Sequence, residues 1–226
     1  MRTTLLKSYI LAVMLAAAAA AAWTGRMFPM TEIGGWLAVL MWTFAVGPQS
    51  VAFPKHRVQI TAADCFLFYC LVVHGPLGAM TAAFVGTLGA QELGDRRLSK
   101  QQTMFNLSSI PLSAAAAGYA FDALSTGHGM WAPLLVAASV FAVVNTVLVI
   151  VVLALEGKAG AIKNLTGPAP GFVLSVFVTA VAGGVLAEMA ARGPGDWTVA
   201  GAVAVCFLVG TVLTVVRDRH EAAVAG

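Results

Sequence analysis

The chain has 226 residues, of which 59% are hydrophobic and only 10% are charged, and its formal net charge is +3. Soluble domains carry about 25% charged residues, so this composition excludes a water-soluble globular protein and indicates a chain whose outer surface faces lipid. The sequence has no block of Lys and Arg with interleaved aromatic residues, which argues against nucleic acid as a partner.

Apolar segments suited to transmembrane helices follow one another along the whole chain. A bilayer core needs about 20 apolar residues per helix. We therefore predict an all-α, polytopic transmembrane helical bundle of about eight spans, within a range of about six to eight, forming a single membrane domain over residues 1–226. The shortest candidate, 60–74, leaves the count open. The predicted spans are 8–24, 33–53, 60–74, 76–92, 104–123, 130–155, 169–191 and 197–216.

The distribution of basic residues predicts the orientation of the bundle. If the N-terminus is inside and the eight spans alternate, the outside receives only Arg26 and Arg192 of the 13 Lys and Arg residues. Cytoplasmic loops carry such an excess of basic residues, so both termini are predicted to be cytoplasmic. The tryptophans agree, because most of them fall at predicted outer ends, where an amphipathic ring prefers the interface: Trp23, Trp36, Trp131 and Trp197.

The candidate ligand-binding residues are polar side chains within predicted spans, because each needs a partner or a cavity there. Asn145 lies at the centre of 130–155, where no interface is within reach. Asn106 begins the span at 104–123, Asp64 lies near the start of 60–74, and His74 ends that segment. These four residues are the predicted ligand-binding set.

Each of these polar residues also has a structural alternative. Asp64 can reach the headgroups or pair with an arginine of the inner loops (Arg57, Arg96 or Arg97), and Asn145 can join two helices by a hydrogen bond. His74 can cap the outer turn that Gly75 and Pro76 form.

Small residues predict where helices approach each other closely. In the segment 76–92, Ala82, Gly86 and Ala90 recur every four residues and Gly89 adds to the same face. Such a stripe lets two backbones come together. The alanine run at 16–22, with Ala16 and Ala20 on one face, offers a similar surface to another helix or to a partner protein.

No residue pattern indicates an enzyme or a metal site. The sequence has no Walker loop, no GxSxG, no HExxH and no paired carboxylates at helical spacing within a span. Cys65, Cys70 and Cys206 lie in apolar segments without CxxC or Cys/His ligand spacing. The sequence does not indicate a cofactor.

The middle of the chain resembles a group of bacterial membrane sensor domains that precede GGDEF, HD-GYP or histidine-kinase modules. The resemblance covers residues 58–150 and rests on the segment ITAADCFLFYCLVVHGPLGAMTAAFVGTLGAQ at 60–91, on Met104-Phe105-Asn106 and on Val144-Asn145-Thr146. The Gly75-Pro76-Leu77-Gly78 step also resembles the substrate-binding S-components of energy-coupling-factor vitamin transporters. Both resemblances imply a multi-pass protein of the bacterial cytoplasmic membrane.

Three functions follow from these patterns as alternatives. The first is a small-ligand-binding module, sensory or substrate-capturing, that acts through a partner protein. The second is an S-component-like subunit of a vitamin or micronutrient transporter, and the third is a structural subunit of a larger membrane complex. The expected partners are membrane lipid, another membrane or membrane-associated protein, and a small-molecule ligand.

Overall fold

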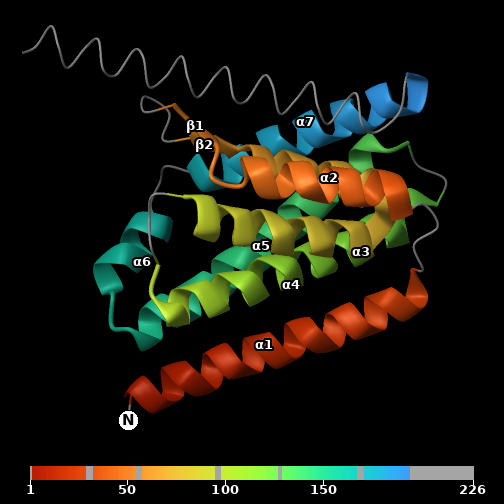
Figure 1. Ribbon diagram of the computed structural model, residues 1–226. Helices are drawn as coiled ribbons and strands as arrows, with labels where there is room; N and C mark the ends of the chain where they lie inside the picture. Colours follow the sequence, from red (N-terminus) through yellow and green to blue (C-terminus); the bar gives the residue numbers. More distant parts are fainter. Residues whose placement is uncertain are drawn as a thin grey trace, which may run out of the picture.

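The computed structural model describes residues 2–28, 33–53, 58–94, 98–126, 129–166 and 171–193. Apart from one short two-stranded ribbon, this part of the chain is all-α, as predicted (Figure 1). The predicted eighth span, 197–216, lies outside the described residues. The elements are α1 (Arg2–Met27), α2 (Ile33–Val46), β1 (Ser50–Phe53), β2 (Val58–Thr61), α3 (Ala62–Leu93), α4 (Lys100–Ser125), α5 (Trp131–Leu155), α6 (Ala159–Thr166) and α7 (Gly171–Arg192).

The helix α3 reverses direction at Gly75. This glycine has φ 70° and ψ −166°, outside the helical region, and Pro76 follows it. A Cβ atom placed on Gly86 would lie 2.7 Å from the Cβ atom of Ala63. In a straight helix these residues would be about 34 Å apart, so the two halves of α3 lie antiparallel. The predicted segments 60–74 and 76–92 are therefore separate helical arms joined at Gly75.

The predicted span 33–53 is too long at its C-terminal end. The helix α2 stops at Val46, and residues 50–53 form β1 instead. Pro48 explains this end, because proline lacks a backbone N–H and disfavours helical geometry in the residue before it. The strand β1 pairs antiparallel with β2, in register from Ser50 opposite Thr61 to Phe53 opposite Val58.

The core of the bundle lies between α3, α4, α5 and α7. Phe68 of α3 and Phe141 of α5 meet edge to face, with ring centroids 5.8 Å apart, a favourable arrangement for two aromatic rings. Small residues let α7 reach this core, because a Cβ atom on Gly183 would lie 2.6 Å from the carbonyl oxygen of Cys65. The buried cluster includes Leu67, Phe68, Leu71, Ala114, Leu134, Phe141, Val176 and Ala180.

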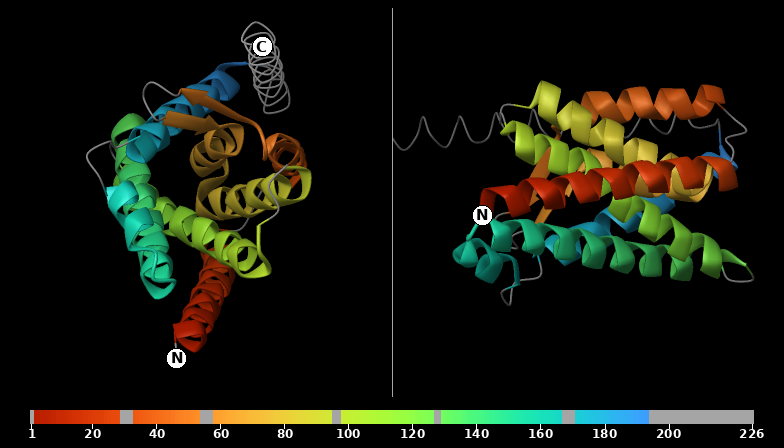
Figure 2. Two further views of the ribbon diagram at one scale, coloured as in Figure 1. Left: turned by 90° about the vertical axis from the view of Figure 1, so that its left-hand side faces the viewer. Right: turned by 90° about the horizontal axis from the view of Figure 1, so that it is seen from below.

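The first helix lies on the outside of the bundle. The ribbons place α1 along one side, mainly against α4 (Figures 1 and 2). Leu6, Ile10 and Val13 of α1 pack around Phe105 of α4, whereas much of the remaining surface of α1 is exposed. In a membrane, that exposed apolar surface would contact lipid or another membrane protein.

Four helices of the described part are long and apolar enough to cross a membrane: 4–27, 62–93, 131–156 and 172–192. The second of these comprises both arms of α3, so it turns back at Gly75 and does not run straight. Its first arm, 62–74, is only about 20 Å long at about 1.5 Å per residue, shorter than the roughly 30 Å bilayer core. Neighbouring helices cover this arm, which is almost completely buried from Cys65 to Leu71.

One hydrogen bond joins α2 to the second arm of α3. The indole Nε1 of Trp36 donates to the Thr81 hydroxyl at 3.1 Å. We expect Trp36→Phe to lower the free energy of unfolding by about 0.5–1 kcal/mol, because interhelical hydrogen bonds in membrane proteins contribute about that much. Thermal unfolding in mild detergent measures this change. Trp23→Phe is the control, because Trp23 is exposed on α1; equal melting of the two variants would contradict the prediction.

Candidate ligand-binding cavity

A cavity of about 360 Å³ lies between the two arms of α3 and the first turns of α4. The size is at the low end of the roughly 300–1,000 Å³ found for small-molecule sites. Glycine and alanine form much of its wall on the α3 side, including Ala63, Ala83, Gly86 and Ala90. The reversal at Gly75 creates this space, because it brings the beginning and the end of α3 together.

Asp64 reaches the cavity from the first turn of α3. Thr61 is the N-cap of this helix, and its hydroxyl accepts a hydrogen bond from the Asp64 backbone N–H at 3.3 Å. A carboxylate in the first turn also suits the partial positive charge at a helix N-terminus. Within the described part of the chain, no Lys or Arg forms an ion pair with Asp64. Loops 54–57 and 95–97, which carry the predicted partners Arg57, Arg96 and Arg97, lie outside the described residues.

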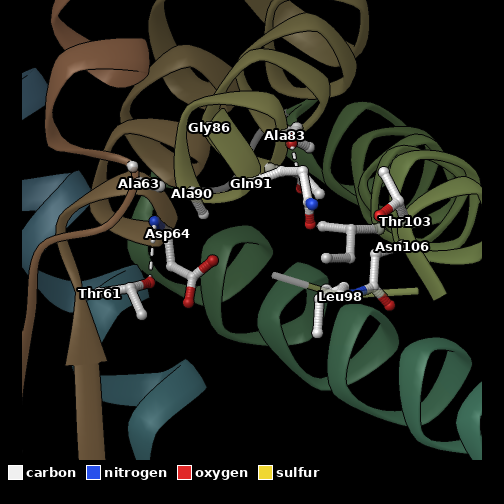
Figure 3. Close-up of a pocket in the computed structure, with 13 residues that line it drawn as sticks. Thr61, Ala63, Asp64, Ala83, Gly86, Ala90, Gln91, Leu98, Thr103 and Asn106 are labelled. Carbon is white, nitrogen blue, oxygen red and sulfur yellow. Dashed lines mark hydrogen bonds between the residues drawn. The ribbon is translucent and has the colours of Figure 1, made fainter. Parts of the chain in front are cut away.

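Two amide side chains face Asp64 across the cavity. Figure 3 shows Asp64 on one side, Asn106 of α4 on the opposite side, and Gln91 of α3 between them. The Oε1 atom of Gln91 is buried and accepts no hydrogen bond within the described residues. A buried polar atom of this kind ordinarily has a partner, so its position on the cavity wall indicates a group that a ligand or water satisfies.

The structure brings together only two of the four predicted ligand-binding residues. Asp64 and Asn106 line the cavity, whereas Asn145 and His74 do not. Asn145 is half-buried on α5. His74 lies at the Gly75 turn, where its ring contacts Tyr69 with centroids 6.4 Å apart.

Three further polar residues were not predicted as ligand-binding residues: Gln91, Thr87 and Thr103. All three line the cavity. Their spacing in the sequence could have indicated them. Thr87 and Gln91 are four residues apart on α3, and Thr103 and Asn106 are three apart on α4. Each pair therefore lies on one face of its helix. A search for polar pairs at this spacing would have found them.

The predicted small-residue stripe of α3 lies against α2 and the first arm of α3. A Cβ atom on Gly89 would lie 2.1 Å from the carbonyl oxygen of Phe44, and Ala82 is completely buried. On α1 the arrangement differs, because Ala16 is exposed and Ala20 only half-buried. Neighbouring alanines of α1, including Ala17 and Ala21, line an apolar groove of about 390 Å³ beside α2, α3 and α4.

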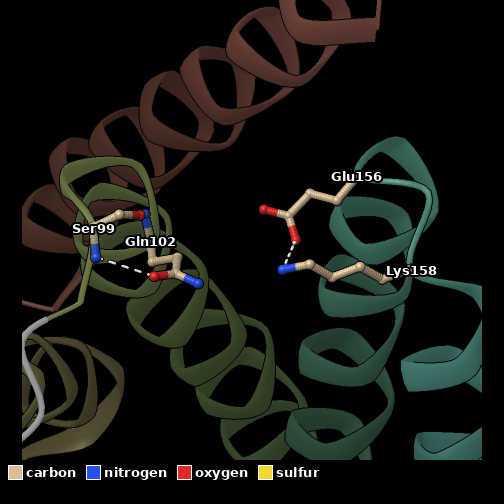
Figure 4. A network of polar contacts seen from close by, with 4 residues as sticks. All are labelled: Ser99, Gln102, Glu156 and Lys158. Atoms are coloured by element: carbon tan, nitrogen blue, oxygen red, sulfur yellow. Dashed lines mark hydrogen bonds and ion pairs between the residues drawn. The ribbon is translucent and has the colours of Figure 1, made fainter.

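A second, smaller cavity adjoins the first through Asn106 and Leu98, which line both. It measures about 200 Å³ and lies between α1, α4 and α5. Polar groups from two elements face each other here (Figure 4). The Ser99 N–H donates to Gln102 Oε1 at 3.0 Å at the start of α4, and Lys158 Nζ lies 2.7 Å from Glu156 Oε2 where α5 ends.

Comparison with known proteins gives one family. The family model MASE9, which describes membrane-associated sensor domains, matches residues 35–188, more than half of the chain. The chain belongs to this family. The match to MASE9 includes α2 to most of α7 and therefore every residue named at the cavity. No curated protein and no solved structure matches the chain.

The MASE9 assignment confirms part of the sequence-based resemblance. It confirms a membrane sensor domain. The predicted link to GGDEF, HD-GYP or histidine-kinase modules stays a prediction, as does the likeness to transporter S-components. The chain is a membrane protein of a sensor-domain family.

Proposed function

We propose that this MASE9 domain is a sensory module of the bacterial cytoplasmic membrane that binds a small ligand among its helices and acts through a partner protein. The observation that carries the proposal is the cavity at the open ends of the α3 hairpin. It combines a carboxylate, two amides and several hydroxyls in a chain of a sensor-domain family. Convergent polar groups in an otherwise apolar pocket are typical of binding sites.

The position of Asn106 suggests how binding reaches a partner. Its side chain lies between the ligand cavity and the smaller cavity that contains Glu156 and Lys158. A ligand that draws Asn106 toward Asp64 would change the packing between the start of α4 and the end of α5. We propose that this pair of helix ends, together with α6, is the surface that reports binding.

We further propose eight spans with both termini in the cytoplasm. Support comes from the helical arms described above and from the charges at the two ends of the bundle. The start of α1, the two strands and α6 gather at one end (left in Figure 1). Lys7, Lys100 and Lys158 belong to segments at that end, whereas Arg26 and Arg192 end α1 and α7 at the other. By the positive-inside rule, this distribution supports a cytoplasmic position for the first end.

Filling the cavity is expected to abolish ligand retention. Thr87 lines the cavity, and within the described part of the chain its hydroxyl donates one hydrogen bond, to the Ala83 carbonyl of its own helix at 2.7 Å. Thr87→Leu therefore adds bulk to the cavity without breaking a contact between helices. Native mass spectrometry of the purified protein, after incubation with a bacterial extract of small metabolites, should show bound molecules on the wild type and none on Thr87→Leu.

Thr87→Val serves as the matched control, because it removes the hydroxyl and keeps the volume. We expect this variant to retain the ligand at least in part. Equal retention by Thr87→Leu and the wild type would show that the ligand binds elsewhere. Copurification with an ATPase-bearing complex would favour substrate capture for a transporter over a sensory role.

A further inference from the structure

One acidic side chain carries the charge that the described residues bring to the cavity. Among the described residues that line it, Asp64 is ionisable and the others are amides, hydroxyls and apolar groups. No described Lys or Arg neutralises Asp64. A carboxylate that leaves water is costly unless an opposite charge or hydrogen-bond donors replace the water. Within the described part of the chain, the cavity therefore has no positive charge to balance Asp64, and a cationic ligand could supply one.

The other polar groups of the cavity also suit a ligand that donates hydrogen bonds. The buried Oε1 atom of Gln91 is an acceptor without a donor in the described part of the chain. The Asn106 side chain adds a second amide on the opposite wall (Figure 3). A carboxylate and a carbonyl oxygen both accept hydrogen bonds, and an ammonium group has several N–H donors to give them.

The cavity has room for more than a bare metal ion. A water molecule takes about 30 Å³ of liquid, so a cavity of about 360 Å³ has room for a group of many atoms. The opposite wall supplies apolar contact through Leu98 and Ile110. These surfaces match an organic cation with an apolar body and a charged end.

We propose that the cavity binds small organic ammonium ions, with the ammonium group held by Asp64 and Gln91 and the apolar body against Leu98 and Ile110. This inference rests on the proposed function, because it names the ligand class of the same site. It assigns Asp64 the role of charge recognition and not that of an ion pair with the arginines of the inner loops.

The test uses three probes of similar shape and different charge: 2-phenylethylammonium, 2-phenylethanol and 3-phenylpropanoate. Each is titrated into the full chain in lipid nanodiscs by isothermal calorimetry, with empty nanodiscs as the blank. We expect the ammonium probe to bind about tenfold to a hundredfold more tightly than the alcohol, the usual ratio for a charge-assisted hydrogen bond. Asp64→Asn should remove this preference and leave binding of the alcohol unchanged.

The comparison of the three probes in the wild type keeps the test decisive even if Asp64→Asn does not fold. Equal binding of the ammonium and the alcohol, or tighter binding of the carboxylate, would overturn the cationic ligand class. A preference for the ammonium probe that persists in Asp64→Asn would also overturn it.

The variant Thr87→Leu distinguishes a failure of the cationic ligand class from a failure of the proposed function. If Thr87→Leu abolishes binding of all three probes and none is preferred, the cavity is a ligand site and only the cationic class is wrong. If Thr87→Leu leaves binding of every probe unchanged, the cavity is not the site, and both proposals fall.

Discussion

Replacing Gly89 with alanine is expected to destabilise the bundle by about 1–3 kcal/mol. A Cβ atom at this position would lie 2.1 Å from the carbonyl oxygen of Phe44 and 2.9 Å from its carbonyl carbon. Both are backbone atoms of α2, so no side-chain rotation can relieve the clash. The two helices must separate, and the contacts along the stripe must weaken. Thermal unfolding of the purified protein in mild detergent measures the loss.

Gly25→Ala is the matched control for this substitution. Gly25 lies in α1, and a Cβ atom there would meet nothing within 4 Å. Alanine also has the higher helix propensity, so the melting temperature of Gly25→Ala should stay the same or rise slightly. If Gly89→Ala melted at the same temperature as Gly25→Ala, this result would contradict the close approach of α2 and α3 at Gly89.

Replacing Gly75 with alanine is expected to cost about 1–3 kcal/mol for a different reason. A Cβ atom here would meet nothing within 4 Å, so no steric clash with a neighbour is involved. The cost comes from the backbone, because φ 70° with ψ −166° is a conformation that essentially only glycine adopts. The variant must either strain the turn or let the arms of α3 move apart.

The control for Gly75→Ala is Gly34→Ala, which adds the same methyl group to open space within α2. It should not lower the melting temperature. The Gly75 variant should also lose affinity for any ligand of the cavity, because the turn holds Asp64 and Gln91 on facing walls. A Gly75 variant with full stability and full ligand affinity would contradict the assigned geometry.

Hydrophobicity and charge predicted most of the helices. Long apolar segments, such as 130–155, match α5 within a residue or so. The C-terminal end of α2 and the strand β1 could not be predicted from hydropathy, because residues 51–53 are apolar whether they form a helix or a strand. There Pro48 was the informative residue, and its effect on the preceding residue is local and independent of hydropathy.

The cavity was harder to predict than the fold. Asp64 and Asn106, which line the cavity, were predicted as ligand-binding residues because polar groups within a span are costly. The rotation of each helix and the reversal of α3 decide which polar residues lie close together in space. A single sequence does not specify either of them. Asn145 was predicted as a ligand-binding residue because of its central position in a span, but it does not line this cavity.

The α3 hairpin also has a consequence for biosynthesis. Its first arm is about 20 Å long and carries an aspartate, so it is a poor substrate for insertion into a bilayer by itself. The second arm, 76–93, is longer and rich in small residues that fit against the first. We therefore expect the two arms to enter the membrane as a pair, once synthesis has passed about Leu93.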